Sequence, residues 1–149
     1  MTTTIDDATL TVTVNEDVKL NGQQVGSKIV QTILNINEAS RRVFSVPIYE
    51  TEILALSSSA GAGTYITSDL QYVRVSNMDD TNFVRLTFIS GSSNRYDMKL
   101  PAKRTAVFTS PSISVSESGA TFGSFVDFSS MKATADTAAV DIELFVAST

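Results

Sequence analysis

The stretch that most constrains the fold is 70–100, in which three short segments alternate apolar and polar residues. Side chains alternate between the two faces of a strand, so a period of two between polar turns predicts half-buried strands. The intervening turns are predicted at 77–82 and 91–94. The sequence thus predicts three consecutive antiparallel strands that share one core. Their expected apolar faces are formed by Val73, Val75, Val84, Leu86, Phe88, Tyr96, Met98 and Leu100.

Strand patterns also precede this stretch. Residues 9–14 alternate threonine with leucine or valine, which predicts a strand. Asn21–Gly22 predicts a two-residue hairpin turn, because both residues tolerate a positive φ. Residues 28–36 fit a helical face or a strand, and their β-branched content favours the strand. We expect a turn or a single helical turn at 37–42. Further strands are predicted at 43–46 and 52–56.

About ten short strands at regular spacing, with no convincing helix, indicate an all-β protein. We predict a single antiparallel β-sandwich or jelly-roll-like domain over residues 1–149. The polar residues 1–7 are predicted to form a flexible N-terminal arm. Residues 131–137 fit a strand or a loop. The strong alternation of 140–146 predicts a strand that pairs into the sheet.

Composition excludes several classes of function. The chain has no histidine and no cysteine, so it lacks the commonest general base and the usual ligands of transition metals. It also lacks a phosphate-binding loop and a serine nucleophile elbow. We therefore predict no enzyme activity, no metal and no cofactor. The net charge of −5 argues against nucleic-acid and membrane partners, and the N-terminus has no secretory-signal pattern.

The polar clusters favour structural interpretations. Asp79, Asp80 and Asn82 carry oxygen ligands that suit calcium, but they lack the spacing of a helix-loop-helix calcium site. Aspartate and asparagine also favour turns, and we interpret this cluster as a turn. The carboxylates spread over the predicted strands show no local sign of a catalytic pair. Residues 57–63 are small and predict a flexible loop that either is solvated or adapts to a neighbouring subunit.

A few residues are candidates for an interface. Phe145 is predicted on the charged face of the last strand, where a lone monomer would expose it unless a second core layer covers it. The strand pattern does not assign Phe44 or Phe122 to the core, and Arg41 and Arg42 form an adjacent basic pair. We predict that these five residues contribute to contacts with other subunits.

Two stretches carry a family resemblance. YVRVSNMDDTNFVRLTF (residues 72–88) and ADTAAVDIELFVAST (residues 135–149) resemble a family of small virion structural proteins of marine tailed phages. The likeness extends more loosely to 20–22 and to 41–47. It covers about half of the chain and contains no catalytic residues to transfer.

The resemblance implies a non-enzymatic component of a phage particle, assembled in the host cytoplasm. The first expectation is a head cement or decoration protein that binds the major capsid protein lattice or other virion subunits. A symmetric homo-oligomer, a trimer in particular, would match the threefold junctions of an icosahedral shell. A tail or neck component and a carbohydrate-binding adhesion module are the alternatives; a glycan site normally presents exposed aromatic platforms, and this chain has no tryptophan.

Overall fold

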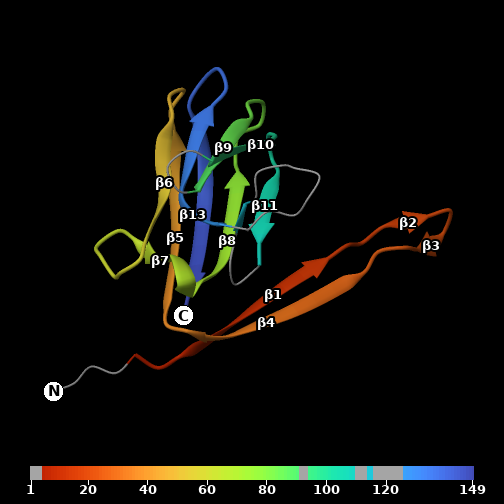
Figure 1. Cartoon of the computed structure of the whole chain (residues 1–149). Helices are drawn as coiled ribbons and strands as arrows, with labels where there is room; N and C mark the ends of the chain where they lie inside the picture. The colour runs from red at the N-terminus through yellow and green to blue at the C-terminus, as the bar shows by residue number, and fades with distance from the viewer. Residues whose placement is uncertain (1–4, 91–93, 110–113, 116–125) are drawn as a thin grey trace, which may run out of the picture.

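Two β-sheets face each other as a sandwich, and a two-stranded ribbon projects from one end of it (Figure 1). The computed structural model describes residues 5–90, 94–109, 114–115 and 126–149. Sheet 1 contains, in spatial order, β11 (Thr105–Phe108), β8 (Leu70–Asn77), β14 (Val140–Ser148) and β5 (Glu38–Val46). Sheet 2 contains β10 (Asn94–Leu100), β9 (Val84–Ser90), β13 (Val126–Ala135), β6 (Thr51–Ser57) and β7 (Tyr65–Ile66), with β12 (Ser114–Val115) beside β13.

The remaining elements are short or belong to the ribbon. The ribbon pairs β1 (Ala8–Asn15) with β4 (Lys28–Ile36), and its tip pairs β2 (Lys19–Leu20) with β3 (Gln23–Gln24). A single 3₁₀ turn, η1 (Thr67–Asp69), leads from β7 into β8. The prediction of an all-β sandwich is confirmed. The predicted flexible arm at 1–7 overlaps residues 1–4, which lie outside the described part of the chain.

The core lies between the two sheets, where period-two side chains from both sheets meet. Val73 and Val75 of β8 are fully buried, as are Val84 and Leu86 of β9. The prediction that these faces share one core with 98–100 is confirmed, because Leu100 is buried and Met98 packs against it. Tyr96 differs: its ring lies 5.9 Å from that of Phe88, yet more than half of the residue is exposed.

The C-terminal strand β14 lies in the middle of sheet 1, between β8 and β5. Its inward residues Val140, Ile142, Leu144 and Val146 are all buried. This confirms the prediction that the chain ends in a paired strand. Residues 131–135, predicted as strand or loop, belong to β13, whose partners on its two sides are β9 and β6.

The prediction of three consecutive paired strands is wrong in one respect. β9 and β10 form the expected hairpin, but β8 belongs to sheet 1 and does not pair with β9. Residues 78–83 cross from one sheet to the other, and Asn77 Nδ2 donates to the carbonyls of Asn82 and Leu100. The alternation predicts which face of each strand is buried. It does not show whether the next strand along the chain pairs with it in the same sheet or lies opposite it in the other sheet.

The turn expected at 37–42 is also wrong. Only Asn37 separates β4 from β5, and β5 runs from Glu38. The polar residues 38–42 become strand because each pairs with β14, from Glu38 opposite Ser148 onward. The predicted hairpin at Asn21–Gly22 is confirmed, with φ of 50° and 82°, and so is the strand over 28–36.

Candidate functional site

The β1–β4 ribbon, with its β2–β3 tip, is the most conspicuous surface feature, and we call residues 8–36 the arm. Its ladder keeps one register from Leu10 opposite Ile33 to Asn15 opposite Lys28. Asn35, with φ of 61°, lies at a register shift where the arm joins the sandwich. The arm leaves the sheets at their lower end in Figure 1 and extends beyond β11. Gln31 Nε2 donates to the carbonyl of Thr109, just after β11, at 3.5 Å.

The base of the arm packs against the outer face of sheet 1. Leu10, Val12 and Ile33 cover a second apolar cluster formed by Ile36, Tyr72 and Ala147, together with Phe145. The rings of Tyr72 and Phe145 meet edge to face at 5.7 Å. Burial raises the pKa of the Tyr72 hydroxyl. Phe145 thus belongs to a second core layer, which was the alternative to an exposed interface position.

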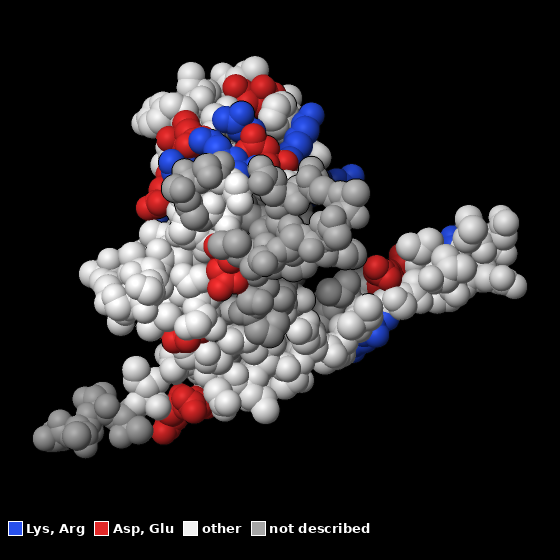
Figure 2. Space-filling view, in the orientation of Figure 1, with Lys and Arg blue, Asp and Glu red and all other residues white. Residues whose placement is uncertain are grey.

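The outer part of the arm is apolar and uncovered. Half of the exposed large apolar side chains in the described chain lie on the arm, between 46% and 63% exposed. Figure 2 shows the arm as a largely uncharged projection, whereas many charged groups gather where the two sheets are joined. A ribbon of two strands gains little stability by itself in water, and exposed apolar patches mark interaction sites. The residues are Val14, Val18, Leu20, Val25, Ile29 and Val30 and, nearer the base, Leu34.

Sequence reasoning identified the strands of the arm but not the arm itself. The signal was the ambiguity of 28–36, in which Ile29 and Ile33 lie on one face while Val30 and Leu34 lie on the other. A strand that is apolar on both faces has a sequence pattern that also fits a helix or a buried strand. Here it is a strand whose outer part is exposed on both faces.

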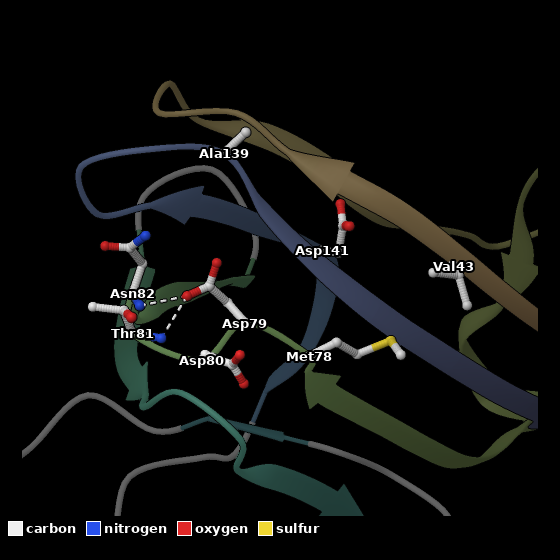
Figure 3. Close-up of a pocket in the computed structure, with 8 residues that line it drawn as sticks. All are labelled: Val43, Met78, Asp79, Asp80, Thr81, Asn82, Ala139 and Asp141. Carbon is white, nitrogen blue, oxygen red and sulfur yellow. Dashed lines mark hydrogen bonds between the residues drawn. The ribbon is translucent and has the colours of Figure 1, made fainter.

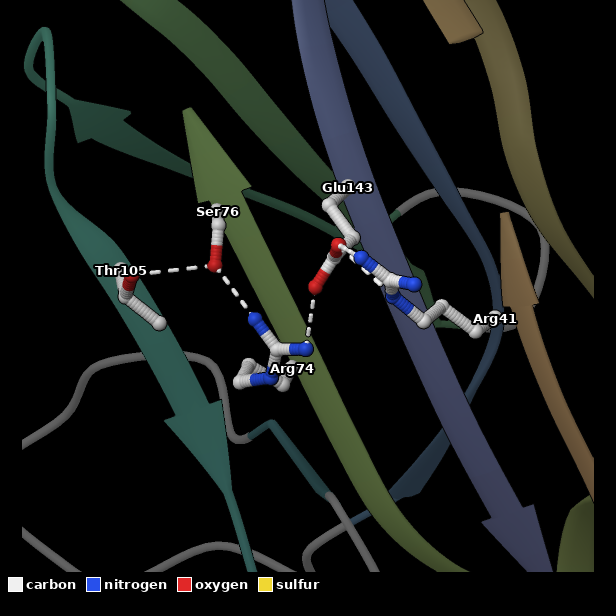
Figure 4. Close-up of polar contacts among 5 residues, drawn as sticks. All are labelled: Arg41, Arg74, Ser76, Thr105 and Glu143. Carbon is white, nitrogen blue, oxygen red and sulfur yellow. Dashed lines mark hydrogen bonds and ion pairs between the residues drawn. The ribbon is translucent and has the colours of Figure 1, made fainter. Parts of the chain in front are cut away.

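A charged network crosses the outer face of sheet 1 (Figure 4). Glu143 is 8% exposed. Its carboxylate accepts from Arg41 Nε at 2.8 Å and Nη2 at 2.5 Å on one oxygen, and from Arg74 on the other. Arg74 also donates to Ser76 Oγ at 2.7 Å, and Ser76 Oγ lies 3.0 Å from Thr105 Oγ1. These bonds join all four strands of sheet 1.

The network has a clear electrostatic consequence. The hydrogen bonds from Arg41, and then those from Arg74, lower the pKa of the Glu143 carboxyl. In turn Glu143 raises the pKa of Arg41. We predicted Arg41 as an interface residue, and the structure shows that its guanidinium is engaged within the chain. Glu143 was considered only as one of several dispersed carboxylates, because its partners lie on other strands.

The other predicted interface residues do not form one patch. Phe44 is partly buried against the main core, and the Arg42 guanidinium lies 5.0 Å from the centre of its ring. Both side chains lie on the inner side of β5, whereas Arg41 lies on the outer side. Phe122 lies outside the described residues.

The acidic turn after β8 is built around Asp79 (Figure 3). One oxygen of its carboxylate accepts from the backbone N–H groups of Thr81 at 2.7 Å and Asn82 at 2.6 Å, which lowers its pKa. Asp80 pairs with Lys103 at 2.8 Å. An open depression of about 460 Å³ lies beside this turn. The arrangement fits the turn interpretation, and among the described residues no group of three potential ligands is placed to hold a metal.

A second depression, of about 170 Å³, opens between the sheets at the edge formed by β5, β6 and β7, and we call it the edge groove. Its floor is apolar, with the buried residues Ile53, Leu54, Leu144 and Val146. Ile53 and Leu54 are adjacent yet both buried, because an irregularity in the β6–β13 pairing places an extra residue there. The rim is polar and includes Glu38, Ser40, Arg42 and Tyr65.

Comparisons with protein-family models, curated proteins and solved structures found no match for this chain. Within the described ranges, no helix has the length and apolar character needed to cross a membrane. Function is therefore inferred from the surface of the molecule itself.

Proposed function

We propose that this protein is a non-enzymatic structural subunit of a bacteriophage virion. In this proposal it is a head cement or decoration protein that binds the major capsid protein lattice and stabilises the shell. It acts as a symmetric homo-oligomer, a trimer, that matches a threefold or quasi-threefold junction. It acts through complementary surfaces that become buried on assembly.

The observation that carries the proposal is the exposed apolar arm. A side chain such as Leu20 or Ile29 gains about 1.5–3 kcal/mol when it moves from water to a fully buried position. A projecting ribbon that keeps several such residues in water fits a protein whose final state covers them. A subunit that assembles with other subunits meets this condition.

The virion assignment itself comes from the resemblance of 72–88 and 135–149 to small structural proteins of tailed phages. These residues include most of β8 and β9, all of β14, and the two crossings at 78–83 and 136–139. A β-sandwich that presents a projecting arm suits a role in which many weak contacts are repeated around a symmetric junction.

The test is to locate the protein in the particle. Shells assembled from the phage's major capsid protein are mixed with the purified protein, sedimented and imaged. We expect the protein to co-sediment at a fixed ratio and to appear as added density at threefold or quasi-threefold junctions. Density at the neck or tail would overturn the head assignment. Absence from particles and shells, together with specific binding on a glycan array, would replace the proposal with an adhesion module.

A further inference from the structure

We propose that the arm of one copy docks in the edge groove of the next copy, so that copies join head to tail in a closed ring. The inference deepens the proposed function, and it rests on that function for the expectation that the ring has three members. The occupant of the groove is therefore a second copy of this chain.

The placement of the two surfaces supports this pairing. The arm extends beyond β11, at one edge of sheet 1, while the edge groove lies at β5, at the other edge of the same sheet (Figure 1). Arm and groove of a single chain therefore lie on opposite sides of the sandwich. An element on one side and its receptor on the other produce a heterologous contact, which forms a ring when the rotation closes.

The two surfaces also fit chemically. The tip of the arm carries Leu20, which is 62% exposed, and the groove has an apolar floor. Residues 38–42 of β5 border that groove, where Ser40 Oγ lies 2.5 Å from the Tyr65 hydroxyl of β7. Among the described strands, β5 pairs only with β14. Its other edge has backbone groups available for a strand of the incoming ribbon.

Charges on the arm and the rim are complementary. Four charged side chains make no ion pair with any described residue: Lys19 and Lys28 on the arm, and Glu38 and Arg42 on the groove rim. Glu38 offers a carboxylate for a lysine of the arm. Arg42 offers a guanidinium for Asp17, whose carboxylate otherwise accepts from Gln24 at 2.9 Å.

The area of the arm sets how much surface the docked arm must bury. From residue 13 to the tip the ribbon is about 30 Å long and about 10 Å wide, which gives about 300 Å² per face. Covering one face would bury about 600 Å² over both partners, the size of a crystal contact, whereas enclosing both faces would bury about 1,200 Å², the lower end of specific interfaces. The edge groove, of about 170 Å³, is large enough for a side chain of the tip, so pairing of the ribbon along β5 supplies the rest of the buried area in this proposal.

Cysteine pairing between two different variants tests the contact directly. The chain has no cysteine, so introduced thiols react alone. Leu20→Cys protein is mixed with Glu38→Cys protein under oxidised glutathione, and the products are separated without reductant. A disulfide between the two variants joins two chains by construction. The matched control replaces Glu38→Cys with Val107→Cys, an exposed position on β11 at the opposite edge.

We expect the Leu20–Glu38 mixture to give a cross-linked dimer in high yield and the Leu20–Val107 mixture to give little. A dominant Leu20–Leu20 product would show tip-to-tip contact and overturn the proposal. So would a dominant Leu20–Val107 product, or the absence of any cross-link at concentrations where the protein self-associates.

Sedimentation of the wild-type protein tests ring closure. We expect a discrete trimer, shifted at least tenfold toward monomer by Leu20→Ser, while the exposed control Ile48→Ser leaves it unchanged. A monomer at all concentrations, or an open-ended series of sizes, would overturn the ring. If rings form but do not bind shells, the proposed function fails and the ring inference stands. If the protein binds shells but forms no ring, the proposed function stands and the ring inference fails.

Discussion

At the scale of single residues, Glu143 shows how a buried charge is accommodated in sheet 1. It lies on the central strand β14, and its two oxygens accept from guanidinium groups on the neighbouring strands β5 and β8. Removing one partner of such a group costs more than the pair contributes, because the remaining charge is left without compensation. The network therefore holds the order β8–β14–β5 through side chains as well as through the backbone.

This arrangement predicts a pH dependence. The pKa of Glu143 is lower in the folded protein than in the unfolded chain, so the folded state binds fewer protons. The stabilisation is complete above the unfolded pKa of about 4.3 and is lost as the pH falls through the folded value. Glu143→Gln should lower the free energy of unfolding at pH 7 by about 1 kcal/mol and weaken its decline below pH 4. Denaturant unfolding measured from pH 7 to pH 3 checks this.

The matched control is Glu52→Gln, because Glu52 is exposed and forms no ion pair with the described residues. Its acid dependence should equal that of the wild type. An equal slope for Glu143→Gln and wild type would contradict the role given to the network.

Leu86 gives the corresponding prediction for the core. It lies at the centre of the main cluster and is 0% exposed. Leu86→Ala should lower the free energy of unfolding by about 2–5 kcal/mol, because it removes buried methyl groups and leaves a cavity. Leu20→Ala, at an exposed site on the arm, should cost less than about 0.5 kcal/mol in the monomer. Urea unfolding of both variants at low protein concentration measures the difference, and similar losses would refute the burial assignments.

At the scale of elements, the arm is one chain segment with two environments. Its base shares the second apolar cluster with sheet 1, and no residue of its tip is among the described residues that form or cover either apolar cluster. Gly26 shows how closely the two connections between the β1–β4 ladder and the tip approach each other, because a Cβ there would lie 1.7 Å from the carbonyl oxygen of Glu16. The position of the arm relative to the sandwich therefore depends on a small cluster at its base.

Phe145→Ser tests that cluster. We expect a loss of about 2–4 kcal/mol, since a half-buried aromatic ring and its contact with Tyr72 are removed. Amide hydrogen exchange should accelerate first in β1 and β4, while β9 and β13 keep their protection. Unchanged exchange in the arm would contradict the packing of its base. Loss of oligomerisation with normal exchange in the arm would instead make Phe145 an interface residue.

At the scale of the whole molecule, the main core of the sandwich is formed without any described residue of the arm. Four of the crossings between the sheets, at 47–50, 78–83, 101–104 and 136–139, lie at the end opposite the base of the arm, whereas η1 crosses from β7 to β8 near that base. Backbone hydrogen bonds tie these crossings together, for example Lys103 N to Asp79 O at 3.1 Å and Asp136 N to Phe83 O at 3.2 Å. The core is therefore closed without the tip of the arm.

Shortening the arm tests this separation. Asn15 pairs with Lys28, so replacing 16–27 by Asn-Gly leaves a two-residue hairpin at that point. We expect the thermal midpoint of the monomer to change by no more than a few degrees, because few buried contacts are removed. Circular dichroism and calorimetry at low concentration measure it. A collapse of the sandwich would show that the tip contributes to folding.

Much of this architecture was predictable from the sequence by itself. Alternation predicted the inward faces of β8, β9 and β14, and Asn21–Gly22 predicted the turn of the tip, because both signals depend on neighbours along the chain. The same signals predicted an all-β sandwich. They also placed Phe145 on the polar face of β14 and left open whether a second layer covers it.

Only the tertiary structure decided which strands are partners. The crossing from β8 to β9, the strand at 38–42 and the meeting of Glu143 with Arg41 and Arg74 depend on contacts between residues far apart in the sequence. Burial of a face does not specify what covers it, so the pattern at 28–36 was equally compatible with a core strand. The outer part of the arm stays exposed because the inner apolar faces of the two sheets cover each other. Neither sheet has an inner face left to cover the outer ribbon.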